Sequence, residues 1–220
     1  MTKPPASTET ASAANVTKAM PADLWPDVQP DAARRLMFAG VESFARRGYH
    51  ATTTRDIATG AGMSPAALYV HFASKAALLF EISRSGHEQS LALVDNIVGT
   101  EGDPVARMRA VVEEFVAWHA RRHTVARVVQ YELEALPEPE YKIVLGLRRK
   151  IERKVHALIS EGVEAGVFSV PDVRTAAWAV LSLGVDVARW YHERHRKSPK
   201  ALGREYAHLV LNMLGVRQEP

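Results

Sequence analysis

Apolar residues recur every three or four positions along most of the chain after residue 30, a spacing typical of amphipathic α-helices. The pattern predicts helices over residues 31–47, 53–58, 65–71, 78–98, 105–118, 125–136, 141–165, 172–190 and 199–214. No segment shows the alternation of apolar and polar residues that marks a half-buried strand, and no internal repeat is visible. The sequence therefore predicts an all-α fold with about nine helices.

Breaks in this pattern divide the chain into three parts. Residues 1–29 are rich in Ala, Thr, Ser and Pro and show no apolar period, so we expect a disordered, solvated N-terminal arm with a short ordered piece around Leu24 and Trp25. Residues 30–76 hold three short predicted helices and form a small domain. Residues 77–220 form a larger helical bundle, in which glycines and prolines separate successive helices.

Composition bounds the class of protein. With 47% hydrophobic residues and no cysteine, the 220-residue chain can bury a large core without disulfides, and thiolate metal sites and a cysteine nucleophile are excluded. The N-terminus lacks the basic start and apolar run of a secretory signal, and the most apolar later run, residues 176–185, is too short to span a membrane. We therefore expect a soluble, cytoplasmic protein with no membrane partner.

Charge alone does not indicate a nucleic-acid partner. The formal net charge is only +3, and residues 31–82 carry six Lys and Arg against four Asp and Glu. An argument for DNA binding must therefore rest on local geometry rather than on bulk charge.

Residues 48–79 contain three helix starts and two tight turns. Thr53 with Asp56 three positions on resembles a capping box, and Ser64–Pro65 places a capping hydroxyl before a proline at the first helical position. In the short helix that follows, Leu68 and Phe72 are expected to face the core, which leaves small side chains outward. A helix with such a surface can approach base edges closely in the major groove.

These residues closely resemble the N-terminal domain of tetracycline-repressor (TetR) family transcriptional regulators. The motifs that carry the resemblance are TT-x-x-DIA from Thr52, AG-x-S from Ala61, LY-x-HF from Leu68, and Lys75 followed by Leu78–Leu79. The resemblance implies a helix-turn-helix domain whose phosphate contacts come from Thr52, Thr53, Ser64, Tyr69, His71 and Lys75. It implies base readers at Thr54, Arg55, Pro65, Ala66 and Ala67. Because Ala66 and Ala67 carry no hydrogen-bonding group, we expect few direct contacts to base edges. Recognition of the DNA sequence should then depend on apolar contacts, on Arg55 and on DNA shape.

A TetR-like protein pairs this domain with a C-terminal domain that dimerises and usually holds an effector. The last two predicted helices are the natural dimer surface, with candidate residues Gly184, Ala188, Tyr206, Val210 and Met213. The resemblance favours a homodimer on a palindromic double-stranded DNA operator, which follows from two-fold symmetry. The alternative is that these stripes pack within one subunit.

An effector pocket has several candidate residues in the bundle. Large amphipathic side chains and two arginines from basic clusters make up the set: Trp118, His119, His123, Tyr131, Arg148, Trp178, Arg189 and Trp190. Cations beside an apolar cavity would suit an acyl-CoA, and the spacing of Gly184, Arg189 and Tyr206 resembles TetR relatives that control fatty-acid or steroid degradation. Two alternatives to a pocket remain open: the tryptophans belong to the ordinary hydrophobic core, and the arginines lie on a solvated surface.

Other functions have weaker support in the sequence. His119 and His123 have metal-ligand spacing, but no carboxylate follows at a useful position, so we predict no metal and no cofactor. No nucleophile elbow, P-loop or dinucleotide fingerprint is present, so we predict that the chain is not an enzyme. The sequence thus favours a DNA-binding repressor that a small lipophilic or acyl-CoA effector releases from its operator. The alternative is a helical ligand-binding or scaffold protein without DNA binding.

Overall fold

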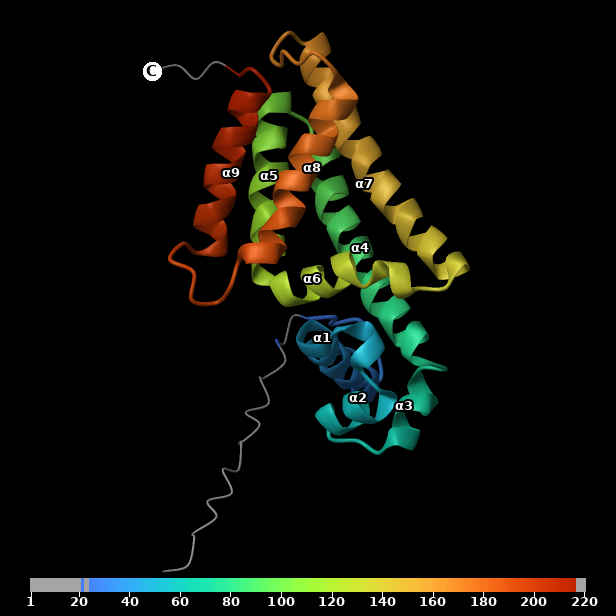
Figure 1. The fold of residues 1–220 in the computed structure, drawn as a ribbon. Coiled ribbons are helices and arrows are strands. Elements are labelled where there is room, and N and C mark those ends of the chain that lie inside the picture. Colours follow the sequence, from blue (N-terminus) through green and yellow to red (C-terminus); the bar gives the residue numbers. More distant parts are fainter. Residues whose placement is uncertain (1–20, 22–23, 217–220) are drawn as a thin grey trace, which may run out of the picture.

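The computed structural model describes residue 21 and residues 24–216. Within these residues the chain forms nine α-helices and one short 3₁₀ helix, with no strand, which confirms the predicted all-α class. Figure 1 shows a small unit made by the first three helices at one end of a larger bundle. Helix α4 (Lys75–Val98) starts beside the small unit and runs up into the bundle, so one rigid element links the two parts.

The small unit consists of α1 (Asp31–Ala51), α2 (Thr54–Gly60) and α3 (Pro65–His71). Gly48 interrupts α1 with a φ of 77°, a left-handed conformation that glycine adopts without steric cost, and this is the stop that the sequence predicts. Leu36, Ile57 and Leu68, one from each helix, are fully buried together. Leu24 and Trp25 are also buried against this core, so the expected ordered piece exists, whereas most of the predicted arm lies outside the described residues.

The bundle continues with α5 (Pro104–Arg121), α6 (His123–Tyr131), the 3₁₀ helix η1 (Leu133–Ala135), α7 (Glu138–Glu164), α8 (Val173–Trp190) and α9 (Pro199–Met213). Helix α5 is central, packing against α4, α8 and α9, with its longest contact along α9. Helix α6 lies across the end of the bundle and also packs against α1 (Figure 1). No helix of the described residues is long and apolar enough to cross a bilayer.

The two predicted helix boundaries around Pro137 and Pro139 are wrong. The segment predicted as one helix over residues 125–136 ends at Tyr131 and continues as a 3₁₀ turn. The next helix begins at Glu138 instead of residue 141, because a proline in the first turn has no amide to satisfy and acidic side chains there favour the helix dipole. Pro137 and Pro139 thus flank a helix start rather than an open turn.

Small residues let three helices of the bundle pack closely. A Cβ atom at Gly203 would lie 2.3 Å from the carbonyl oxygen of Glu113 on α5. A Cβ atom at Gly184 would lie 2.5 Å from the ring of Phe115. Gly184, Ala188 and Val210 are all buried inside the subunit, in line with the alternative that these positions pack within one subunit; their part in a dimer interface stays a prediction.

Gly203→Ala should destabilise the protein by about 1 to 3 kcal/mol, because the added methyl group has to push α9 away from the backbone of α5. Gly146→Ala is the matched control, since nothing lies within 4 Å of a Cβ atom there and alanine favours the helix by about 0.5 to 1 kcal/mol. Urea denaturation followed by circular dichroism measures both free energies of unfolding. Equal stability of the two variants would contradict this account of the α5–α9 contact.

Candidate functional site

The start of α2 is fixed by a complete capping box. The hydroxyl oxygen of Thr53 accepts from the backbone amide of Asp56 at 3.1 Å, and the Asp56 carboxylate accepts from the amide and the hydroxyl of Thr53 at 2.8 and 2.6 Å. These hydrogen bonds, together with the charge of Arg47 at 3.3 Å, lower the pKa of Asp56. The first-turn amides of α2 are therefore held at a constant angle to the rest of the unit.

Helix α3 presents an exposed face beside that cap. The Ser64 hydroxyl accepts from the amide of Ala67 at 3.3 Å, and Pro65 occupies the first turn. Tyr69 and Val70 are 56% and 78% exposed, although both are large apolar side chains. The hydroxyl of Tyr69 lies 3.2 Å from that of Thr54 on α2, so the two helices share one continuous surface.

Two predicted phosphate ligands instead support the turn between α1 and α2. Thr52 is 1% exposed, and its hydroxyl oxygen lies 2.8 Å from the carbonyl oxygen of Gly48. The ammonium group of Lys75 donates to the carbonyls of Tyr49 and Thr52, both at 2.7 Å, and lies 4.1 Å from the centre of the Tyr49 ring. In this structure Thr52 is buried in that turn, and the half-buried Lys75 anchors the turn to α4; the contact of both residues with DNA stays a prediction.

The other predicted DNA contacts lie at the surface. Exposed or half-buried side chains are found at Thr53, Thr54, Arg55, Ser64, Pro65, Ala66, Ala67, Tyr69 and His71. They come from α2, α3 and the caps before them, so the structure brings this part of the predicted set together. Their contact with DNA stays a prediction.

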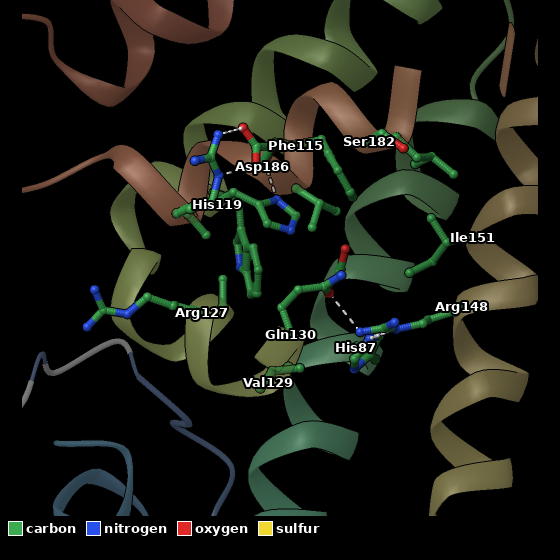
Figure 2. A pocket seen from close by; sticks show the side chains of 18 of the residues that line it. His87, Phe115, His119, Arg127, Val129, Gln130, Arg148, Ile151, Ser182 and Asp186 are labelled. Atoms are coloured by element: carbon green, nitrogen blue, oxygen red, sulfur yellow. Dashed lines mark hydrogen bonds and ion pairs between the residues drawn. The ribbon is translucent and has the colours of Figure 1, made fainter. Parts of the chain in front are cut away.

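A cavity of about 690 Å³ lies in the bundle between α4, α5, α6, α7 and α8. Figure 2 shows its labelled polar side chains entering from several of these helices. Six of the eight candidate pocket residues line it: Trp118, His119, Tyr131, Arg148, Trp178 and Arg189. His123 and Trp190 do not; they pack around Tyr191 on the side of α8 near α9, with ring centroids 5.8 and 6.2 Å away.

His87, Arg148 and Gln130 form a polar cluster in the cavity wall. The Nδ1 atom of His87 lies 2.7 Å from the carbonyl oxygen of Ser83, so it donates a proton and leaves Nε2 as an acceptor. Nε of Arg148 donates to that Nε2 at 3.0 Å, and its Nη2 donates to Oε1 of Gln130 at 2.7 Å (Figure 2). Burial lowers the pKa of both His87 and His119 to about 4, so both are neutral at pH 7.

The carboxylates that line the cavity have other partners. Glu152 accepts from the indole N–H of Trp178 at 2.7 Å, and Asp186 accepts twice from Arg189, at 2.7 and 3.0 Å. Trp178 and Arg189 are both exposed, so these pairs lie toward solvent.

Two family models match the chain. Residues 31–82 match the model described as bacterial regulatory proteins of the tetR family, and residues 101–214 match the tetracyclin repressor-like C-terminal domain. The chain belongs to the TetR family of transcriptional regulators. The first matched segment covers the small three-helix unit and the start of α4, and the second covers the bundle from α5 to α9.

Individual TetR-family relatives resemble most of the chain. The transcriptional repressor KstR2 of Mycobacterium tuberculosis is 31% identical over 189 residues, which cover 80% of this chain and 88% of KstR2. The structure of a tetR-family regulatory protein from Rhodococcus RHA1 superimposes with a TM-score of 0.81 at 37% identity, covering 86% of this chain and all of that one. AibR, solved with isovaleryl coenzyme A and operator DNA, shares the fold at a TM-score of 0.73 and 21% identity, covering 83% of this chain and 97% of its own.

Sequence reasoning on this TetR-family chain missed several polar residues of the cavity: His87, Ser90, Arg127, Gln130, Glu152, Ser182 and Asp186. A signal for two of them exists, since His87 and Ser90 interrupt the apolar face of α4 and are both buried. Arg127, Gln130 and Tyr131 recur at helical spacing on α6, so they share one face. The remaining members come from helices far apart in the sequence, and only the fold brings them together.

The neutral histidines predict a pH dependence of stability. Because the pKa of His87 is about 4 in the folded chain and about 6.5 when unfolded, the free energy of unfolding should fall as the pH drops from about 6.5 toward 4. His87→Gln should remove about 2 to 3 kcal/mol of this loss, since glutamine takes no proton. Urea midpoints at pH 7 and 4.5 measure the difference between the variant and the native chain.

His50→Gln provides the control, because His50 is exposed and lies outside the cavity. This control should follow the native chain at both pH values. Parallel curves for His87→Gln and the native chain would show that burial of His87 makes no contribution to acid sensitivity.

Proposed function

We propose that this TetR-family chain is a homodimeric repressor that binds a palindromic operator in the cytoplasm and leaves it when an acyl-CoA-type effector occupies the cavity. The observation that carries the proposal is that two helices of the cavity, α4 and α6, also contact the small unit that carries the candidate DNA-binding surface. Helix α4 supplies Lys75 to the α1–α2 turn and His87 to the cavity. Helix α6 lines the cavity and packs against α1.

The exposed face of α2 and α3 supports the DNA-binding step. Arg55 provides a guanidinium group that can donate to guanine in the major groove, and Tyr69 provides a hydroxyl for a phosphate. Val70 is apolar and exposed, so it suits contact with a thymine methyl group. Because basic and acidic residues nearly balance in this unit, positioning by caps supports the proposal more than charge does.

Exposed apolar residues on the last two helices support the dimer. Leu183 on α8 is exposed, and Leu209 and Met213 lie four residues apart on one exposed face of α9. Tyr206 is half-buried on the same helix. We propose that these residues, in place of the buried Gly184, Ala188 and Val210, meet their copies across a two-fold axis, as the palindromic operator requires.

The size and lining of the cavity support a small lipophilic effector. A volume of about 690 Å³ lies within the range of about 300 to 1,000 Å³ of small-molecule sites. Phe115, Val129 and Ile151 give it apolar walls, and arginines lie among them. AibR holds isovaleryl coenzyme A on the same fold.

Helix α6 provides a physical route from effector to DNA. Its last turn places Gln130 and Tyr131 in the cavity, and the next residue, Glu132, has a carboxylate oxygen 3.7 Å from the Cβ position at Gly48. The charge of Glu132 also raises the pKa of Lys75, against the lowering by burial. A ligand that displaces α6 would therefore disturb the turn from which α2 starts, and DNA would weaken effector binding by the same factor.

Arg55→Ala and Tyr69→Ala should each weaken binding to the DNA upstream of the chain's own gene by about 10-fold. Fluorescence anisotropy at several salt concentrations measures the affinity and its salt slope. Adding isovaleryl-CoA or longer acyl-CoAs should release the native protein from the same DNA.

Arg153→Ala is the matched control for the DNA experiment, because Arg153 is exposed on α7 in the bundle. It should bind as the native chain does. Unchanged binding by both interface variants would contradict the assigned surface. If no acyl-CoA of the panel releases the protein from DNA, the proposed effector class is wrong, and the proposal that the protein is a DNA-binding regulator is unaffected.

Leu209→Glu should convert the dimer into a monomer, because two glutamates would face each other across an apolar two-fold contact. Size-exclusion chromatography with light scattering measures the mass, and operator affinity should fall with it. Ile143→Glu is the control, since Ile143 is 51% exposed on α7 outside the proposed interface. A dimer that survives Leu209→Glu would place the interface elsewhere.

A further inference from the structure

Arg148 is a cation of the cavity wall that no carboxylate balances. Its side chain is half-buried on α7, and its two hydrogen bonds run to His87 on α4 and Gln130 on α6, both uncharged acceptors. Glu152 lies one turn further along α7, at the position where an i,i+4 ion pair would form, but its carboxylate accepts from Trp178 instead. Among the described residues, no acidic oxygen lies within 4 Å of the Arg148 nitrogens.

The histidines of the cavity wall are neutral and carry no negative charge that could balance Arg148. His87 donates its Nδ1 proton to a backbone carbonyl and accepts from Arg148 through Nε2, so a second ring proton would break the contact with the guanidinium. The Nδ1 atom of His119 likewise lies 2.8 Å from the carbonyl oxygen of Phe115. Desolvation lowers the pKa of Arg148 from its ordinary value, which reflects the cost of holding this charge in the cavity wall.

The guanidinium is nevertheless held in one orientation with donors to spare. Two of its five N–H groups are engaged by His87 and Gln130, which come from different helices and fix the plane. Three N–H groups remain, among them both of Nη1, and adjacent N–H groups of a guanidinium can form two parallel hydrogen bonds to a carboxylate. Figure 2 shows Arg148 reaching from its helix toward His87 and Gln130.

We propose that Arg148, oriented by His87 and Gln130, is a receptor for a carboxylate group on the ligand of the cavity. The inference rests on the proposed ligand-responsive function and adds the chemistry that the ligand must carry. The guanidinium of Arg148 can offer two parallel hydrogen bonds, which match the two oxygens of a carboxylate. Ile151 and Val129 also line the cavity, which fits an apolar body joined to the carboxylate.

Two kinds of ligand could bring this carboxylate: a free carboxylic acid, or an acyl-CoA with a second carboxylate at the far end of its acyl group. Two pairs of compounds distinguish these sources, because the members of each pair differ only in the carboxylate group. Octanoate is compared with 1-octanol, and the mono-CoA thioester of octanedioic acid is compared with octanoyl-CoA. Trp118 and Trp178 line the cavity, so their fluorescence and isothermal titration calorimetry both report binding to the full-length chain.

The carboxylate member of at least one pair should bind the native chain about 10-fold or more tightly than its partner, as expected for charge-assisted hydrogen bonds. Arg148→Met should abolish that preference, and Arg148→Lys should leave an intermediate one, because lysine keeps the charge without the fork. Arg149→Met is the control: Arg149 is the next residue of α7, is exposed, and does not line the cavity. It should keep the native preference.

Several results would overturn the proposal. The first is equal binding of the two members in both pairs, and the second is a carboxylate preference that persists in Arg148→Met. The third is a loss of affinity for free coenzyme A in Arg148→Met that equals the loss for the carboxylate ligand, which would assign Arg148 to phosphate. If Arg148→Met does not fold, the native pairs and Arg148→Lys decide. If the carboxylate members bind more tightly but no acyl-CoA releases the protein from DNA, the role of Arg148 is supported and the proposed acyl-CoA effector is rejected. If octanoyl-CoA releases the protein from DNA and neither pair shows a preference, the effector is supported and the role of Arg148 is rejected.

Discussion

The tie between Lys75 and the carbonyls of Tyr49 and Thr52 is the constraint on which the rest of the structure depends. It fastens the first residue of α4 to the turn from which α2 begins. The bond is strong because the donor is charged and partly withdrawn from water, and the Tyr49 ring adds a cation–π contact. Gly48 makes the turn possible through its positive φ, and the buried Thr52 hydroxyl bonds to its carbonyl. A tilt of α4 therefore cannot leave the α1–α2 turn unmoved.

The bundle divides into a stiff part and a compliant part. Helices α5 and α9 meet through Gly203 with backbone in direct contact, and Gly184 brings α8 onto Phe115. Dense packing of this kind transmits displacement and does not absorb it. The cavity lies on the other side of α5, where α4, α6 and α7 are held together through the polar cluster. Motion is easiest where packing is interrupted, and two of the helices that border the cavity, α4 and α6, pack against α1 of the small unit.

Local chemistry could be predicted from the sequence, whereas assembly could not. The hydroxyls of Thr53, Ser64 and Ser74 bond to amides three residues away, so sequence spacing alone indicates those helix starts. The partner of a small residue cannot be predicted in this way. The sequence around Gly184 is equally consistent with packing against Phe115 of its own subunit and with packing against a second copy of the chain. Similarly, His123 is only four residues from His119, yet it lies after the break between α5 and α6 and turns away from the cavity. The burial of Thr52 likewise could not be predicted, because only the fold shows its hydroxyl bonded inward.

Charge, more than shape, distinguishes this cavity from a void left by loose packing. An apolar residue at Arg148 would fill space without the cost of desolvating a guanidinium, and exchanges of buried charge for well-packed apolar residues are often stabilising. The structure holds the cation beside His87, which burial keeps neutral, so no like charge repels it there. His87 and Gln130 meanwhile fix the plane of the guanidinium, which lowers the entropy lost when an anion binds. An oriented and uncompensated cation is costly in an empty cavity and favourable in an occupied one. The same residues that lower stability without a ligand would therefore give the ligand its binding energy, and they are attached to the two helices that reach the DNA-binding unit.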